Sequence, residues 1–202
     1  MIFEKKLNTF MDFCKIYESG SDDNKIRIGC AMLYFDFNEL KDIQDKISDD
    51  DIYDDDGDHG LETEPHVTLL YGLHSDEVTH DEIFEIIKEY DIPNLKLFNI
   101  SIFENEKYDV LKFEARHDME DYDINGDILY KINKELSKLP HSSNFPEYNP
   151  HSTIAYVNPG TGKKYVDLFK DSEYIVSVKK IVYSEDNKDF SKRDKYEFNV
   201  NK

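Results

Sequence analysis

Two stretches of the chain match each other and decide its fold: PHVTLLY at residues 65–71 and PHSTIAY at residues 150–156. Proline, histidine, threonine and tyrosine stand at the same positions in both, although the 202 residues include only seven histidines and six prolines. Both stretches are rich in β-branched or aromatic residues, which is typical of strands. A match at polar positions is more informative than a repeated apolar pattern, because any two buried strands share the latter. The pair therefore predicts an internal duplication.

The spacing within each stretch decides which side chains face together. Side chains at positions i and i+2 of a strand share one face, so His66 and Thr68 project together, as do His151 and Thr153. If the two strands are neighbours, two imidazoles and two hydroxyls converge on one cleft. A single His-x-Thr on a strand is more often structural, but two at equivalent positions of a duplicated pattern favour a catalytic pair.

Four tyrosines near these motifs have different expected roles. Tyr71 and Tyr156 stand five positions after the histidines, so by parity we expect them on the opposite face, in the core. Tyr53 and Tyr148 precede the two motifs, and we expect their rings to stack on the bases of a nucleotide substrate.

Elements of the same kind surround the two motif strands in a similar order. Helical periodicity or helix-favouring composition predicts helices at about residues 2–18, 38–47, 79–90, 122–139 and 163–169, and β-rich runs predict strands at about residues 26–37, 95–103, 108–115, 174–183 and 196–200. Strands and helices thus alternate twice, which again favours a duplication.

The chain is strongly acidic, with 25 Lys and Arg against 44 Asp and Glu and a net charge of −19. Such a surface repels the phosphates of a long nucleic acid, so we expect no long nucleic acid as a partner. Many of the carboxylates crowd into residues 48–64, which we expect to be a loop. Its acidic residues lack the spacing of an EF-hand, so we expect no metal there. Because this acidic loop runs directly into His66, we expect it to be a mobile flap beside the cleft.

The remaining composition favours a reducing cytoplasm. The two cysteines, Cys14 and Cys30, are too few for a disulfide framework. No stretch approaches the roughly 20 apolar residues that a membrane span requires, so we expect no membrane partner. The first residues show no apolar region typical of a secretion signal.

Two histidines on one cleft suit acid–base catalysis. The free imidazole pKa of about 6.5 allows one ring to accept a proton while the other donates one at neutral pH. Phosphodiester cleavage needs such a pair. The two threonine hydroxyls can hydrogen-bond the non-bridging phosphate oxygens, and this apparatus needs no metal or other cofactor.

At these residues the sequence resembles the two-histidine (2H) phosphoesterase superfamily, over about residues 26–200. The segments 62–74 and 148–160, with residues 28–32 upstream, look most like the bacteriophage branch that contains anti-CBASS protein 1. That branch degrades the cyclic oligonucleotide messengers of bacterial antiphage signalling. The resemblance implies an α+β fold in a single bilobal domain over residues 1–202. Its two pseudo-symmetric lobes would each be an antiparallel sheet with flanking helices, with the active cleft between them.

The resemblance also implies a metal-independent phosphodiesterase in which His66, Thr68, His151 and Thr153 match the family motif without a departure. One histidine would deprotonate a ribose 2′-hydroxyl and the other would protonate the leaving 5′ oxygen. A 2′,3′-cyclic phosphate would form first, and water would then open it. The resemblance does not assign the base and the acid to particular histidines.

The expected substrate is a cyclic di- or oligonucleotide messenger such as cGAMP, cleaved at its 3′–5′ bonds in a host bacterial cytoplasm to evade CBASS immunity. One alternative is a 2′,3′-cyclic phosphodiesterase that acts on RNA ends or small cyclic nucleotides. A second alternative, of another class, is a non-catalytic sponge that sequesters a nucleotide. Intact His-x-Thr motifs at both sites argue against the sponge, because sequestration needs no acid–base pair.

Overall fold

The structure of the protein is a computed structural model that describes residues 26–54, 59–142, 147–188 and 191–200. The helix expected at residues 2–18 lies outside these ranges, as does the centre of the acidic loop.

The described strands form one antiparallel sheet. They are β1 (Ile28–Asp36), β2 (His66–His74), β3 (Asn94–Glu104), β4 (Asp109–His117), β5 (His151–Val157), β6 (Tyr174–Asp186) and β7 (Arg193–Asn199). Their order is β2-β1-β6-β3-β4-β5, with β7 beside β6. From its two ends this order runs β2-β1-β6 and β5-β4-β3, so β2 corresponds to β5, β1 to β4 and β6 to β3. The strand order therefore has the internal symmetry that a duplication requires.

Strand β6 joins the two halves of the sheet. Its first residues, Tyr174–Ser177, pair with Asn94–Leu97 of β3, and the same edge then pairs with β7. Its other edge pairs with β1. We call the half built from β2, β1, β6 and β7 the first lobe and the half built from β5, β4 and β3 the second lobe. The two expected lobes are present, and they share one continuous sheet.

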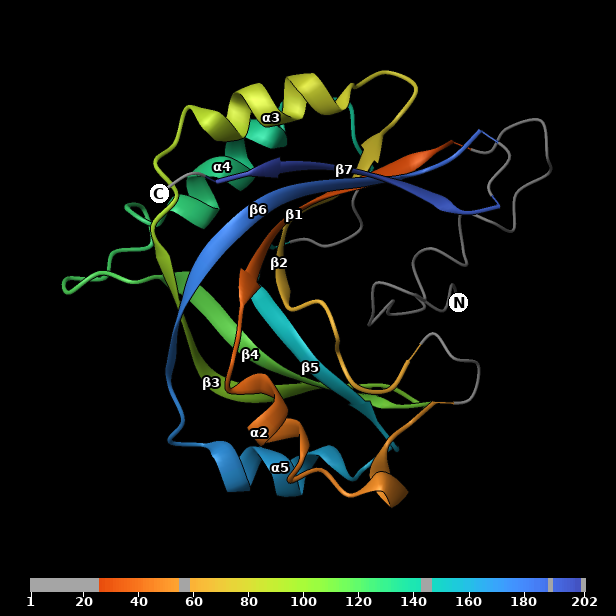
Figure 1. Cartoon of the computed structure of the whole chain (residues 1–202), viewed down its shortest axis with the longest axis vertical. Helices are drawn as coiled ribbons and strands as arrows, with labels where there is room; N and C mark the ends of the chain where they lie inside the picture. The colour runs from red at the N-terminus through yellow and green to blue at the C-terminus, as the bar shows by residue number, and fades with distance from the viewer. Residues whose placement is uncertain (1–25, 55–58, 143–146, 189–190, 201–202) are drawn as a thin grey trace, which may run out of the picture.

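Two helices cover each lobe (Figure 1). The described helices are α2 (Leu40–Gln44), α3 (His80–Lys88), α4 (Ile128–Leu136) and α5 (Gly162–Phe169), with a 3₁₀ turn at Asp49–Asp51. Helices α3 and α4 lie on the first lobe, with α4 also contacting β4, whereas α2 and α5 contact strands of the second lobe. Helix α2 follows β1 but contacts β5, and α4 follows β4 but contacts β2. One helix that follows a strand of each lobe therefore packs against the other lobe, and these two helices connect the lobes.

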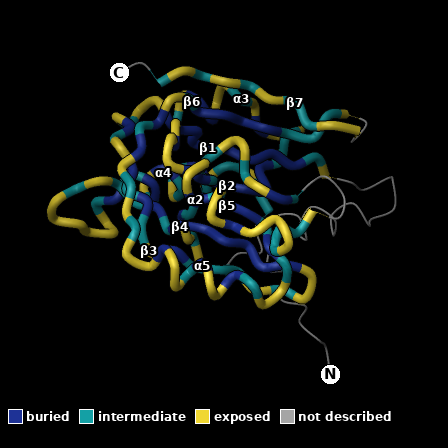
Figure 2. Tube along the Cα trace, turned by 60° about the horizontal axis from the view of Figure 1, so that its bottom comes forward, coloured by how far each residue is buried: buried dark blue, intermediate teal, exposed yellow. Residues whose placement is uncertain are grey.

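The helix-covered face of the sheet holds the main hydrophobic core. Leu33, Leu69, Leu111 and Ile154 are fully buried in it. Figure 2 shows the buried residues concentrated along the inner strands, with exposed residues along the connecting loops. A second, smaller apolar cluster consists of Ile28, Cys30, Met32, Tyr34, Tyr71 and Val182. Strand residues alternate between faces, so this second cluster belongs to the opposite, cleft-facing side of the first lobe.

Two helices are shorter than the sequence predicts. Helix α4 begins at Ile128 rather than near residue 122, because the buried side chain of Asp127 caps it by accepting the Leu129 N–H at 2.8 Å. Helix α2 has Glu39 rather than Asn38 at its N-cap, with no side-chain cap bond. It gives way after Gln44 to tighter turns closed by bonds three residues back.

A β-bulge in β2 places Tyr71 on the opposite face of the strand from the one that the sequence predicts. Met32 pairs with Thr68, but Cys30, two residues earlier on β1, pairs with Tyr71, so Leu69 is an extra residue on β2. Directly paired residues share a face. Tyr71 therefore lies on the same face as Thr68, and it packs in the second cluster rather than in the main core.

Strand β5 carries the equivalent bulge. Lys112 pairs with Thr153 and Val110 pairs with Tyr156, which leaves Ile154 as the extra residue. Tyr156 therefore faces the same side as Thr153, again contrary to simple parity. Both motif strands thus present histidine, threonine and tyrosine on the cleft-facing side.

Candidate active site

The two motif strands meet although they stand at opposite ends of the strand order. The sheet curls so that β2 and β5 come into contact (Figure 1). The Tyr148 hydroxyl, just before β5, donates a hydrogen bond to the Thr68 carbonyl oxygen at 3.0 Å. The structure therefore brings the strand that carries His66 and Thr68 into contact with the strand that carries His151 and Thr153.

Both histidines are held in the same tautomer. The Nδ1 atom of His66 lies 2.8 Å from the Glu64 carbonyl oxygen, and Nδ1 of His151 lies 2.8 Å from the Asn149 carbonyl oxygen. A carbonyl oxygen only accepts, so each Nδ1 carries a proton and donates it. Nε2 is then the nitrogen that takes up or releases a proton in each ring. The chain direction before each motif, set by Pro65 and Pro150, produces the same contact twice.

In the first lobe, His66 rests on an aromatic ring. It stacks on Tyr34 with ring centroids 5.1 Å apart and an interplanar angle of 19°. Nearby, Lys195 donates to the Glu64 carboxylate at 2.7 Å, and this hydrogen bond lowers the pKa of Glu64. A smaller contribution to that lowering comes from His66. The Glu64 carboxylate near His66 is thus paired with Lys195.

In the second lobe, His151 is partly buried beside an aromatic ring. Its ring meets Phe103 edge to face, with centroids 5.1 Å apart. Burial lowers the pKa of His151 to about 4, partly offset by its bond to the Asn149 carbonyl and reinforced by the charges of Lys112 and His66. The influence of His66 places the two rings within electrostatic reach of each other. At neutral pH, His151 is therefore a neutral imidazole with a free lone pair on Nε2.

The sequence analysis missed Lys112. It lies on β4, directly opposite Thr153, and is almost fully buried. Its Nζ donates to Ser101 Oγ at 2.9 Å and sits over the Phe103 ring, 4.3 Å from the centroid. A lysine in the middle of the β-rich run at residues 109–115 is the signal that the sequence offers for it.

Tyr53 lies in an aromatic group at the end of β5. Its ring is 5.4 Å from His59 and 5.1 Å from Tyr108, and its N–H donates to the Tyr156 carbonyl at 3.0 Å. Tyr156 belongs to the same group through Tyr108 and His59. Because Tyr156 shares the face of Thr153, this group lies along the strand from the second motif.

The described flanks of the acidic loop pair with β5. Isolated bridges join Ile52 to Val157 and Leu61 to Ala155. The loop is therefore attached along the free edge of β5 on both sides of residues 55–58. The described flanks of the loop are thus fixed to the second motif strand, and its role as a mobile flap stays a prediction.

Tyr148, the other predicted base-stacking residue, is half-buried between the lobes. Its hydroxyl bonds the Thr68 carbonyl, and its ring meets Tyr130 edge to face at 5.2 Å. Burial raises the pKa of Tyr148 well above its usual value, so the hydroxyl stays protonated. These two contacts connect the segment before β5 to β2 and to α4.

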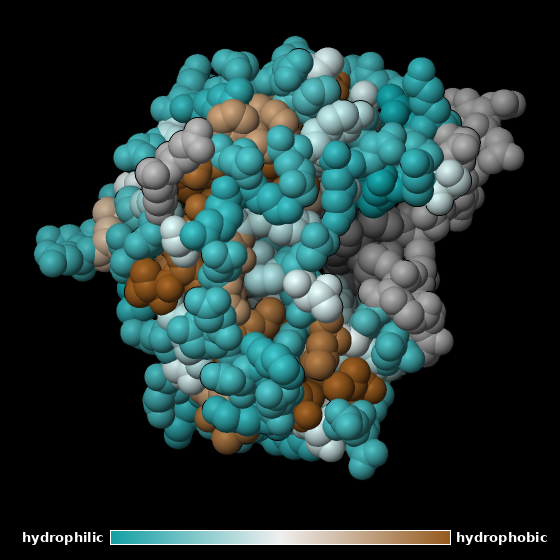
Figure 3. Space-filling view, in the orientation of Figure 1, coloured by the Kyte–Doolittle hydropathy of each residue, from teal (hydrophilic) through white to brown (hydrophobic). Residues whose placement is uncertain are grey.

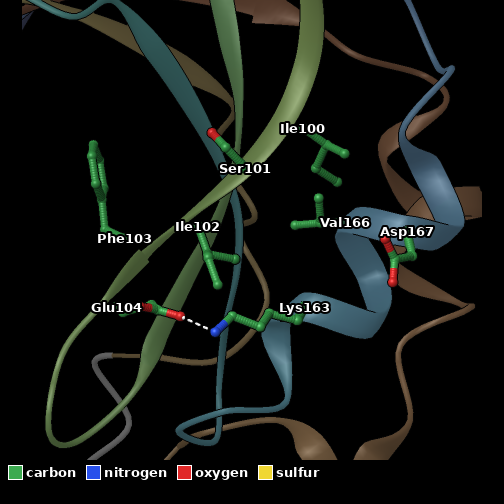
Figure 4. Close-up of a pocket in the computed structure, with 8 residues that line it drawn as sticks. All are labelled: Ile100, Ser101, Ile102, Phe103, Glu104, Lys163, Val166 and Asp167. Carbon is green, nitrogen blue, oxygen red and sulfur yellow. Dashed lines mark ion pairs between the residues drawn. The ribbon is translucent and has the colours of Figure 1, made fainter.

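A surface hollow of about 700 Å³ lies at the edge of β3 beside α5 and contains neither motif histidine. Figure 4 shows Ile100, Ile102 and Val166 gathered on the α5 side, whereas Ser101 and Phe103 point the other way. Lys163 pairs with Glu104 at its rim, at 2.9 Å. The viewed surface of the molecule is mostly hydrophilic, with separate hydrophobic patches (Figure 3).

Within the described ranges, no group of three or more His, Cys, Asp or Glu side chains is arranged to hold a metal ion. The described helices include none that is long and apolar enough to cross a membrane.

No family model matches the chain, and no curated protein matches its sequence. Among solved structures, the chain is similar to Usb1 of Kluyveromyces marxianus, with 12% identity and a TM-score of 0.48 over 83% of this chain and 96% of that one. It is also similar to a protein described as a phosphoesterase, with 11% identity and a TM-score of 0.46 over 86% and 99% of the two chains. A third likeness is to E. coli LigT complexed with ATP, with 10% identity and a TM-score of 0.38 over 86% and 99%. These likenesses concern the fold alone, so the functional argument rests on the site's geometry.

Proposed function

We propose that the protein is a metal-independent phosphodiesterase of the 2H type. The observation that carries this proposal is the pair of histidines on contacting strands, each with Nδ1 fixed by a backbone carbonyl and each followed by a threonine on the same face. A pair of this kind supplies one proton acceptor and one proton donor. The residues that do the chemistry are His66, Thr68, His151 and Thr153.

The proposed reaction begins at a 3′–5′ linkage next to a ribose 2′-hydroxyl. One histidine takes the proton of that hydroxyl at Nε2, and the 2′ oxygen forms a bond to phosphorus. The bond from phosphorus to the 5′ oxygen breaks, and the other histidine gives its proton to that oxygen. Thr68 and Thr153 donate hydrogen bonds to the non-bridging oxygens as charge develops on them. Water then opens the 2′,3′-cyclic phosphate with the two histidine roles exchanged.

The substrate we propose is a small cyclic di- or oligonucleotide messenger, and the biological role is phage evasion of CBASS immunity in the bacterial cytoplasm. The resemblance of segments 62–74 and 148–160 supports this choice. The charge of −19 supports it too, because a long polyanion meets the repulsion of the whole acidic surface. Surface charges are screened beyond about 8 Å at physiological salt, so a compact substrate inside the cleft avoids most of that repulsion. Tyr53 and Tyr148 are the proposed base-contacting residues.

The test is hydrolysis by the purified protein in EDTA. The substrates are 3′,3′-cyclic dinucleotides, cyclic trinucleotides, 2′–5′ oligoadenylate and 2′,3′-cyclic nucleotides. Since one positioned acid or base contributes about 10²–10⁴ in rate, His66→Ala and His151→Ala should each lose at least 10²-fold. His80→Ala is the matched control, because His80 stacks on Tyr196 away from both motifs.

Three outcomes separate the alternatives. Loss of turnover in EDTA, or wild-type activity in either motif variant, would refute the mechanism. Hydrolysis of 2′,3′-cyclic ends alone would refute the messenger substrate and favour RNA-end chemistry. Tight binding of a nucleotide without turnover would favour the sponge.

A further inference from the structure

We propose that Lys112 binds a non-bridging phosphate oxygen of the substrate and, through its charge, makes His151 the base and His66 the acid of the first step. This inference rests on the proposed function, and it assigns the two roles that the symmetric motif leaves open.

Equivalent rows of paired residues cross the two lobes beside the motif threonines. In the first lobe, the row across the sheet is Thr68, Met32 and Val182. In the second lobe, the equivalent row is Thr153, Lys112 and Ser101. The first row is apolar beyond its threonine, and the second carries an ammonium and a hydroxyl. The duplicated framework has thus kept both His-x-Thr motifs and made their neighbours chemically different.

The buried position of Lys112 is unfavourable for a positive charge. It is only 6% exposed, and burial lowers the pKa of its ammonium, partly offset by Glu114. Within the part of the chain that the structure describes, no carboxylate lies within ion-pair distance of its Nζ. One ammonium proton bonds Ser101 Oγ, and the Phe103 ring faces the charge. A buried charge is normally paired, so an anionic ligand is the missing partner.

The position of Lys112 fits a phosphate held by Thr153. The two residues are directly paired on adjacent antiparallel strands, where side chains on one face stand about 4.5–5.5 Å apart at Cβ. The Nζ atom bonds Ser101 on the other side of β4, and a change of the flexible lysine rotamer brings it toward Thr153. One phosphate group can therefore accept from the Thr153 hydroxyl and from the Lys112 ammonium together.

Lys112 is also close enough to His151 to influence its charge. Both contact the same ring, Phe103, whose edge-to-face partner is His151 and whose face lies under the lysine Nζ. A neighbouring positive charge disfavours the imidazolium form. Lys112 therefore helps to keep His151 neutral and able to accept the 2′-hydroxyl proton.

The other charges around the site complete the asymmetry. Glu114 stands opposite His151 on β4, where it accepts from Asn99 Nδ2 at 2.7 Å, and the charge of His66 on β2 also lowers the pKa of His151. In the first lobe the cations near His66 already have partners. Lys195 bonds Glu64, and Lys180, which lies near the Tyr34 ring, bonds Glu197 at 2.6 Å. We accordingly assign the donation of a proton to the leaving 5′ oxygen to His66.

The test compares Lys112→Met, Lys112→Arg and Lys96→Met with the wild type. Lys112→Met installs the residue found at the equivalent first-lobe position, Met32. Lys96→Met is the charge-matched control, because Lys96 lies on the same sheet but is paired with Glu173 at 2.7 Å. Removal of one donor to a developing oxyanion typically costs about 10²–10³-fold in rate. We expect that loss in kcat/KM for a 3′,3′-cyclic dinucleotide in Lys112→Met, partial recovery in Lys112→Arg, and less than about a twofold change in the control.

A second readout does not depend on turnover. NMR titration of the His151 Cε1–H signal, with and without inorganic phosphate, reports the protonation of that ring. We expect Lys112→Met to move the His151 titration, and the acid limb of the kcat/KM profile, to higher pH. We also expect it to weaken the response of the signal to phosphate. A merely structural role would lower activity without moving the titration.

The two proposals fail in different ways. If the wild type cleaves no phosphodiester, the proposed function falls, while the NMR titration still decides the electrostatic role of Lys112. If the wild type is active but Lys112→Met keeps its rate or its His151 titration, the role of Lys112 is overturned. A titration that moves in the Lys96→Met control as well would also overturn it.

Discussion

The hydroxyl of Tyr148 donates a hydrogen bond to the carbonyl oxygen of Thr68, at 3.0 Å, and so connects the segment before one motif to the main chain of the other. The two strands are at opposite ends of the sheet, so this bond fastens its two ends together. It acts on the backbone of a proposed catalytic residue, and it belongs to a hydroxyl that burial keeps protonated.

Tyr148→Phe tests this fastening. The change removes the donor and keeps the ring, so we expect a loss of about 1 kcal/mol in the free energy of unfolding, measured by urea denaturation. We also expect a drop in kcat, because the Thr68 backbone loses a restraint beside the reacting phosphate. Tyr130→Phe is the control, since the Tyr130 ring packs against Tyr148 without that bond. Wild-type stability and kcat in Tyr148→Phe would show that the bond does not position the site.

Tyr53→Leu tests base stacking at the end of β5. Stacking of one base on an aromatic ring contributes about 1–3 kcal/mol, which corresponds to about 5- to 150-fold in Kd. We expect a rise of that size for a cyclic dinucleotide, measured by calorimetry with His151→Ala protein to prevent turnover. Tyr53→Phe keeps the ring and should bind within a factor of about two or three. Equal binding by the leucine and phenylalanine variants would remove Tyr53 from the substrate site.

The depressed pKa of His151 predicts how stability depends on pH. The ring titrates at about 4 in the folded protein and at about 6.5 when unfolded, so the unfolded state binds more protons between these values. The contribution of this ring to the free energy of unfolding is therefore fully present above about pH 6.5 and is lost as the pH drops toward 4. The full effect is about 3 kcal/mol, at 1.36 kcal/mol per pH unit.

His151→Asn removes this titration and serves as the comparison. The difference in unfolding free energy between wild type and variant should shift in favour of the variant from pH 7.5 to pH 4.5, measured by urea denaturation at both values. Titration of the many carboxylates affects both proteins and cancels in the difference. A difference that stays constant with pH would contradict the assigned environment of His151.

Asp109 holds the start of α5. Its Oδ2 accepts the Gly160 N–H at 2.9 Å and the Gly162 N–H at 3.2 Å, and the residue is buried. Asp109→Ala leaves both donors without this acceptor and should lower the free energy of unfolding by about 1–3 kcal/mol. Asp167→Ala, on the exposed side of α5, should change it by less than about 0.5 kcal/mol. Urea denaturation of the two variants decides whether the Asp109 bonds anchor the helix.

The sequence predicted most of the fold, and the repeated polar residues of its two motifs mark strands that the structure brings into contact. The hairpin of β3 and β4, the capped helix α3 and both motif strands lie close to their predicted positions. The faces of Tyr71 and Tyr156 were wrong, because a bulge adds one residue to a strand and reverses the alternation after it. The residue preferences within a β-rich run do not indicate where a bulge occurs.

Lys112 was missed for a different reason. A lysine inside a strand normally extends to solvent, and only the curl of the sheet determines that this one is buried beside Thr153. The start of α4 was misplaced because the helical pattern continues upstream of Asp127, whose cap overrides it. Tertiary placement, which sequence periodicity does not report, accounts for both.

The junction between β3 and β6 has a mechanical consequence. Only the pairs from Asn94–Leu97 to Tyr174–Ser177 connect these strands, whereas β1 and β6 are paired from Gly29–Asp36. Fewer residue pairs hold the sheet together at this junction than between any other two neighbouring strands of the described sheet. The two lobes that meet at this junction also meet at the motif strands, where β2 contacts β5 and Tyr148 bonds the Thr68 carbonyl. The lobes are thus joined at both ends, so contacts beside the motifs resist a twist at the short junction, and the distance between the imidazoles depends on both connections.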